Sequence, residues 1–89
     1  MRPYKNIQQT SKYIVREFNE NIDPTELLWH RDNESRTIEA IYHSDWKIQL
    51  DNQLPKTIDS PVYIKKHEWH RLIKGTNTLT LKIYLHKDN

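Results

Sequence analysis

The chain has 89 residues, enough for one domain but not for a second hydrophobic core. Only 35% of the residues are hydrophobic, and a domain of this size buries about 60–65% of its unfolded surface, so we expect a small core supplemented by burial in a homodimer. The chain has no cysteine, which excludes disulfides, thiolate zinc sites and redox chemistry at sulfur.

The charge is mildly basic, with a formal net charge of +2 and an isoelectric point near 8.9. A small basic cluster (Lys65, Lys66, Arg71 and Lys74) is interspersed with acidic residues, so nucleic acid is not expected as a partner. No apolar run is long enough to cross a bilayer, and residues 1–12 are polar, unlike a signal peptide. We therefore expect a cytoplasmic location and no membrane partner.

The N-terminal half is predicted to contain an arm and three strands. Residues 1–10 show no periodicity and are predicted to form an arm that is ordered only if it pairs with another segment, whereas residues 11–89 form one domain. The β-rich run 13–18 predicts a strand that ends at the turn residues 19–21. Residues 27–30 are too few for a helix before the break at 31–33 and are predicted as a strand, followed by another over 37–42.

The C-terminal half alternates apolar and polar residues more regularly. Strands are predicted over 46–51, 61–64, 69–73 and 79–85, and in the last of these the apolar residues Leu79, Leu81, Ile83 and Leu85 share one face. Gly75 lies in a predicted hairpin turn, and Asn and Asp are expected at the other turn positions that need positive φ. Roughly seven short strands at 8–12-residue spacing with no convincing helix predict an all-β sandwich or barrel.

Two short segments carry the residues with potential chemistry. His30 and Asp32 are two positions apart, so in an extended chain they project from the same side. Forty positions further on, His67 and His70 flank the start of another predicted strand. Two histidines and a carboxylate on converging strands could bind a divalent metal.

These segments resemble the two sequence motifs of the cupin superfamily. Residues 28–32, the strand 36–42 and the turn at 44–46 resemble a degenerate first motif, and residues 59–70 are similar to the second. Within cupins the chain looks most like the minimal single-domain proteins of bacteria and tailed phages. The resemblance implies a small double-stranded β-helix, or jelly-roll, barrel.

The resemblance also implies a ligand set. His30 matches the first metal-binding histidine and His70 the last, while Asp32 stands where the second histidine would be. Two histidines and one carboxylate suit Fe(II) and similar ions, so one divalent metal (Fe, Mn, Ni or Zn) is the expected cofactor. Arg36 stands near the place of the glutamate and is expected to bind an anionic small-molecule ligand. His67 takes the place of a glycine, so it is either a turn residue or a further contributor to ligand binding.

Two other interpretations stay open. An ion pair between Arg36 and Asp32 would neutralise the carboxylate and leave a metal-free, non-catalytic cupin that acts as a dimeric binding or assembly module. A nucleic-acid-binding β-module would use the basic cluster and exposed aromatic residues. Trp29 and Trp69 each precede a candidate ligand and are expected to point away from it, packing on an outer face or at a dimer interface.

Overall fold

The computed structural model describes residues 4–22 and 27–86. Over these residues the chain forms strands and no helix, and accordingly no helix that could cross a membrane. The strands are β1 (Lys5–Gln9), β2 (Tyr13–Phe18), β3 (Ser35–Ala40), β4 (Lys47–Leu50), β5 (Lys56–Thr57), β6 (Val62–Ile64), β7 (His70–Ile73) and β8 (Leu79–His86). The all-β fold class expected from the sequence is confirmed.

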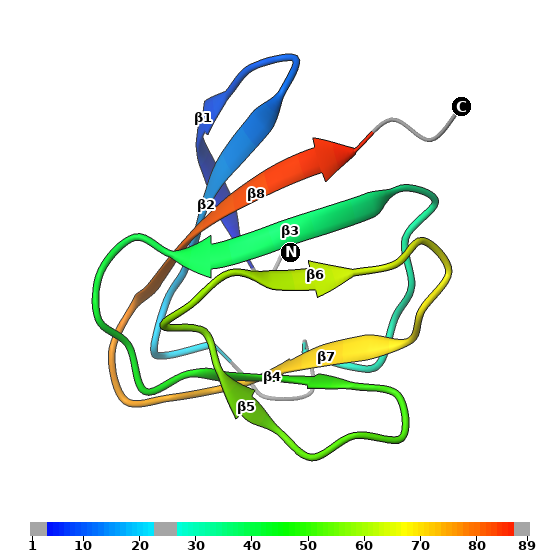
Figure 1. Cartoon of the computed structure of the whole chain (residues 1–89). Coiled ribbons are helices and arrows are strands. Elements are labelled where there is room, and N and C mark those ends of the chain that lie inside the picture. Colours follow the sequence, from blue (N-terminus) through cyan, green and yellow to red (C-terminus); the bar gives the residue numbers. More distant parts are fainter. Residues whose placement is uncertain (1–3, 23–26, 87–89) are drawn as a thin grey trace.

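The strands form two antiparallel sheets that enclose the core (Figure 1). The larger sheet has the order β1-β2-β8-β3-β6 and the smaller one the order β5-β4-β7. Strand β8, the last of the described strands, lies between β2 and β3 in the middle of the larger sheet, so it pairs with strands from the first half of the chain. Such non-consecutive pairing is the jelly-roll feature that strand spacing alone could not specify.

The core is made of the inward residues of both sheets. Its fully buried side chains include Trp46, Ile48, Ile58 and Leu79. The apolar alternation of β8 therefore has the expected cause, since Leu79, Leu81 and Ile83 face the smaller sheet. The indole N–H of Trp46 is buried with its ring and donates to the backbone carbonyl of Asn77, so no polar atom of that ring is left without a partner.

Most of the predicted strands are confirmed, with shifted ends. β2 matches the prediction, and β3 begins and ends two residues before the predicted span. Residues 5–9 of the predicted arm form β1, which is ordered because it pairs with β2 in the same chain. Residues 1–3 of the arm and 87–89 of the domain lie outside the described residues. The two-residue strand β5 was not predicted.

The strand predicted over residues 27–30 is wrong. Among these residues, only His30 pairs with another strand, through a single bridge to His70. One reason is local, because the imidazole of His30 bonds the carbonyl of Leu28 at 3.1 Å and so occupies a group that strand pairing would use. The segment is therefore an extended connection attached to the smaller sheet at one point.

Among residues 4–22 and 27–86, two residues other than glycine have positive φ, Asn52 at 58° and His67 at 65°. Asn52 confirms the expectation that asparagine fills such turn positions. His67 occupies the place where the cupin motif has glycine, and its backbone has the left-handed conformation that glycine adopts without strain. The prediction of His67 as a turn residue is thus confirmed.

Candidate metal centre

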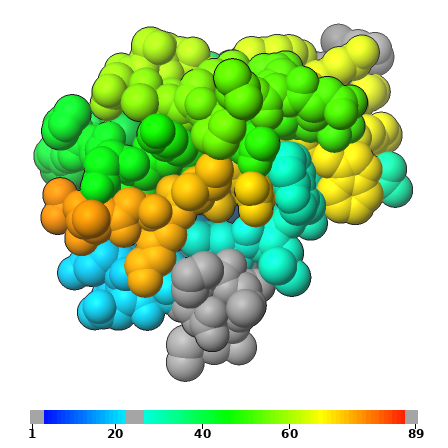
Figure 2. All heavy atoms as spheres, turned by 90° about the horizontal axis from the view of Figure 1, so that it is seen from below, coloured from blue at the N-terminus to red at the C-terminus, as the bar shows by residue number. Residues whose placement is uncertain are grey.

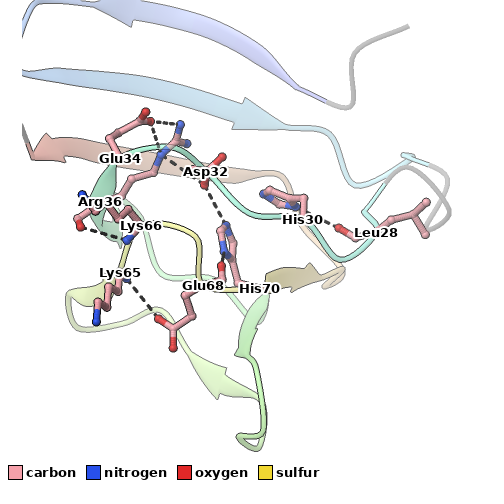
Figure 3. A network of polar contacts seen from close by, with 10 residues as sticks. Leu28, His30, Asp32, Glu34, Arg36, Lys65, Lys66, Glu68 and His70 are labelled. Atoms are coloured by element: carbon pink, nitrogen blue, oxygen red, sulfur yellow. Dashed lines mark hydrogen bonds and ion pairs between the residues drawn. The ribbon is translucent and has the colours of Figure 1, made fainter.

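The candidate ligands converge where the connection before β3 meets the start of β7 (Figure 3). His30 and His70 exchange both backbone hydrogen bonds, each of 2.9 Å from N to O. Two residues further on, the carbonyl of Asp32 accepts a 2.8 Å hydrogen bond from the backbone N–H of His67. These three bonds bring segments that are forty positions apart into contact.

The three side chains that the sequence singled out do meet. One ligand atom from each of His30, Asp32 and His70 lies within 4.8 Å of the other two. The two imidazole rings are in edge contact with their centroids 4.3 Å apart. His70 is buried, Asp32 is partly buried and His30 is exposed, so the cluster is open on the His30 side.

Backbone carbonyls orient both imidazole rings. Nδ1 of His30 lies 3.1 Å from the carbonyl oxygen of Leu28, and Nδ1 of His70 lies 2.8 Å from that of Glu68. A carbonyl only accepts, so each Nδ1 carries the proton, and in a neutral ring the lone pair is then on Nε2. This is the arrangement in which histidine binds a metal through Nε2 while a second group holds the ring.

Asp32 supplies a carboxylate oxygen that lacks a conventional hydrogen bond. Its Oδ2 is buried without such a partner, although Nε2 of His70 lies 3.2 Å away. When His70 is neutral, that contact brings two acceptors together, which is unfavourable unless a cation lies between them or a proton is added to Nε2. The residues therefore fit a divalent cation.

The charge state of Asp32 also suits a cation site. Burial acts to raise the pKa of its carboxyl, whereas a hydrogen bond donated by Nε2–H of His70, the Arg36 guanidinium and positive charge on the two imidazoles act to lower it. The lowering effects are larger in sum, so the pKa of Asp32 lies below its ordinary value. The side chain is therefore ionised at neutral pH even though only 18% of it is exposed.

Arg36 is held mainly by a different carboxylate. Its Nε lies 3.5 Å from Oδ2 of Asp32 but 2.9 Å from Oε1 of Glu34, with which its terminal nitrogen also bonds. Figure 3 shows the guanidinium between the two carboxylates. The ion pair with Asp32 that the sequence allowed is thus present, but Glu34 is the closer partner.

His67 lies apart from the cluster. It is exposed, and within the described chain it contacts the site through its backbone N–H to Asp32. It is not among the residues that line the cavity described next. A contribution of its side chain to ligand binding stays a prediction.

A cavity of about 470 Å³ lies between the sheets, and the three candidate ligands and Arg36 are on its wall. Most of the remaining lining is isoleucine and leucine, including Ile38, Ile48 and Leu72. Figure 2 views the molecule from the side where the segment around residue 30 (cyan) borders β7 (yellow to orange). The volume is that of a small-molecule site.

Three lining residues, Tyr4, Arg16 and Trp29, were not predicted at the site, and Trp29 was expected to point away from it. The inward position of Arg16 could have been predicted from the alternation of β2, because Arg16 is two residues from each of the buried residues Ile14 and Phe18 and so lies on the same face of the strand. No pattern marked Tyr4, because it precedes β1 and reaches the cavity only through tertiary packing against Phe18, at 5.7 Å between ring centroids.

Tryptophan–arginine pairs flank the two histidines on both sides. The tripeptide Trp-His-Arg occurs at 29–31 and again at 69–71, and the backbone bridge pairs the two copies antiparallel. The Arg71 guanidinium lies 5.0 Å from the centroid of the Trp29 ring, and that of Arg31 lies 5.2 Å from the Trp69 ring. The tryptophans remain 40% and 43% exposed. Each pair is a cation–π contact that ties the connection to β7.

The chain has a cupin-like fold that carries a candidate metal centre, and the cupin fold expected from the motifs is confirmed by comparison with solved structures. No protein-family model matches the sequence, and no curated protein matches it in sequence. The similarity to known proteins therefore lies in the backbone fold and not in the sequence.

Three solved structures illustrate the likeness. A candidate mannose-6-phosphate isomerase from Ralstonia eutropha JMP134 has a TM-score of 0.66 at 9% identity, over 96% of this chain and 83% of that one. KdgF from Halomonas sp. has a TM-score of 0.63 at 10% identity, over 96% and 80%. The Fe(II) form of HppE has a TM-score of 0.64 at 14% identity, over 93% of this chain but 48% of its own length. At these identities the comparisons establish the fold.

Proposed function

We propose that this protein binds one divalent metal ion through His30, Asp32 and His70 and a small molecule in the adjoining cavity. The observation that carries the proposal is the orientation of the donors. Both imidazoles have Nδ1 on a backbone carbonyl, and Oδ2 of Asp32 is buried opposite Nε2 of His70. This donor set leaves open positions on an ion such as Fe, Mn, Ni or Zn.

Each residue has a defined part in this proposal. The two imidazoles bind through Nε2, and Asp32 contributes the single negative charge of the donor set. Arg36 stays with Glu34 and limits how far the Asp32 carboxylate can turn, because it also contacts Oδ2. When bound, the ion would supply Lewis-acid chemistry to a ligand in the cavity. Solved structures of Fe(II) and Co(II) forms of HppE are consistent with a metal in a fold of this kind.

The test is metal analysis of untagged protein purified without chelator, followed by titration of the metal-free protein with Co²⁺ and Zn²⁺. We expect close to one equivalent of bound metal, lost in His70→Ala and in the isosteric Asp32→Asn. His43→Ala is the matched control, because His43 is exposed beside Asp59 and away from the cluster. Protein that binds no ion after reconstitution with Fe(II) and Zn(II) would contradict the proposal.

The second candidate is a metal-free binding or assembly module that acts as a homodimer. The observation in its favour is the contact of Arg36 with Asp32, which offers the carboxylate a partner other than a metal. If this candidate holds, Asp32→Asn changes only stability, and sedimentation analysis finds a dimer whether or not metal is added. The homodimer and the cytoplasmic location stay predictions of the sequence.

A further inference from the structure

The wall of the cavity between the two sheets is mostly hydrocarbon. Away from the candidate metal ligands it is built by inward side chains of both sheets, including Ile38, Ile64, Ile83, Ile48 and Leu72. The four isoleucines are buried, and Leu72 packs against the core that they belong to. An apolar cavity lowers the stability of a protein in proportion to its empty volume, so a ligand that fills it offsets that cost.

The charged groups on the wall are already engaged. The guanidinium of Arg36 is bonded to Glu34. Arg16 is held by the ring of Tyr4, by the amide oxygen of Asn6 and by a further interaction within the chain. Among the described residues, the rest of the wall consists of hydrocarbon and aromatic side chains and the three candidate metal ligands. A ligand therefore finds its polar partner at the metal end and meets hydrocarbon over most of its surface.

The exposed rim of the cavity is apolar as well. Leu28 and Trp29 line the cavity although 67% and 40% of their surfaces are exposed. Large apolar side chains at the opening of an apolar cavity are typical of binding sites, because a bound ligand covers them. Both residues directly precede His30, so the apolar rim and the metal end belong to one site.

The volume limits the size of the ligand. A cavity of about 470 Å³ holds as much space as roughly fifteen water molecules at liquid density. By the same measure, an unbranched chain of about eight carbon atoms with a small polar head fits without displacing the core.

We infer that the cavity binds a small apolar organic molecule, with one polar head at the metal end and its hydrocarbon part between the sheets. The inference rests on the proposed function for the contact between the head and the metal. The preference for hydrocarbon depends on the wall alone and holds in metal-free protein. Hydroxyl groups along the length of a ligand are disfavoured, because they would lose water without gaining partners on this wall.

The test uses probes that differ in chain length or in one hydroxyl group. 1-Butanol, 1-hexanol, 1-octanol and 1,6-hexanediol are titrated into metal-free protein by calorimetry. Acetohydroxamic, hexanohydroxamic and octanohydroxamic acid are titrated into Co²⁺-loaded protein. The variant is Leu72→Phe, which fills part of the cavity. Ile73→Phe is the matched control, because Ile73 is the next residue of β7, faces the other side of the strand and is not on the wall.

We expect the affinity of wild-type protein to rise about fourfold for each methylene added to the chain, as burial of that group predicts. 1,6-Hexanediol should bind about tenfold more weakly than 1-hexanol, because its second hydroxyl is buried without a partner. Leu72→Phe should weaken binding of the eight-carbon probes about tenfold and leave acetohydroxamic acid nearly unaffected, since only the long chains reach the filled space. Ile73→Phe should bind every probe like the wild type.

Two results in wild-type protein overturn the inference without any variant: an affinity that does not depend on chain length, or equal affinity for 1,6-hexanediol and 1-hexanol. Undiminished binding of the long chains by Leu72→Phe also overturns it. The metal proposal fails alone if the protein does not bind Co²⁺ but the alcohols show the chain-length dependence. The inference fails alone if Co²⁺ binds and the dependence is absent.

Discussion

The thermal stability of this protein should rise with bound metal and should lose that rise when His70 is replaced by alanine. Co²⁺ present at 100 times its dissociation constant stabilises the folded state by about 2.7 kcal/mol when it binds the folded state alone. For 89 residues the unfolding entropy is roughly 0.19 kcal/mol/K, so the melting temperature should rise by about 14 °C. His70→Ala removes one of three donors and should reduce the rise to a few degrees.

The variant also has an effect that does not depend on metal. His70 is 5% exposed and lies 3.2 Å from Asp32, so its removal leaves a void beside a partly buried carboxylate. We expect this loss to cost about 2–3 kcal/mol in metal-free protein. The comparison is therefore between the Co²⁺-induced shifts of the two proteins and not between their absolute melting temperatures.

Differential scanning calorimetry with and without Co²⁺ measures both effects. Asp32→Asn, which preserves shape, should lose the Co²⁺-induced shift in the same way, and His43→Ala should keep it. A wild-type protein whose melting temperature does not change with millimolar Co²⁺, or a His70→Ala variant that shifts as much as the wild type, would refute the assignment of the ligands.

Three further predictions concern residues around the site. Replacing Arg71 by methionine should weaken Co²⁺ binding about threefold in a calorimetric titration, because the connection that carries His30 is then no longer held by the contact with Trp29. Arg71→Lys should restore part of the affinity. An unchanged affinity in Arg71→Met would show that the tryptophan–arginine pair does not support the site. In metal-free protein, the pKa of Asp32 lies below its ordinary value. Its ionised form therefore stabilises the fold above pH of about 4, and this advantage over Asp32→Asn is lost as the pH falls through the lowered pKa. Urea unfolding of both proteins between pH 2 and 6 measures the effect. A difference in unfolding free energy that does not change with pH would contradict the prediction. His67→Gly should raise stability by about 1 kcal/mol by relieving positive φ without changing Co²⁺ affinity, and a loss of affinity would instead make His67 a ligand.

Much of the fold could be predicted from local pattern. The alternation of Leu79, Leu81 and Ile83 indicated which face of β8 is buried, because a strand places every second side chain on the same face. The same rule placed His30 and Asp32 on one side of their segment, and the resemblance to the cupin motifs supplied their counterpart, His70. The three residues do lie together in the structure.

Other features depended on contacts between distant segments. The sequence could not show that Glu34 is the nearer partner of Arg36, or that the two Trp-His-Arg tripeptides pair with each other. Arg16 could be assigned to the inner face, but the cavity it lines forms only when both sheets are in place. Side-chain partners of this kind are chosen by proximity in space, which local periodicity does not encode.

Gly75 also separates what the sequence predicts from what only the tertiary structure explains. A lone glycine between two strands predicts a hairpin turn, but β7 and β8 belong to different sheets, so Gly75 lies in a connection between the sheets and the hairpin prediction is wrong. Its φ is not positive, however, and a Cβ atom there would come within 2.1 Å of Oδ1 of Asp45 and 2.8 Å of the backbone nitrogen of Trp46. Sequence by itself determined where the chain alternates and turns, because those features follow from neighbouring residues. The tertiary structure alone decided why position 75 must be glycine and which charged groups share the cavity, since both depend on atoms brought together from remote parts of the chain.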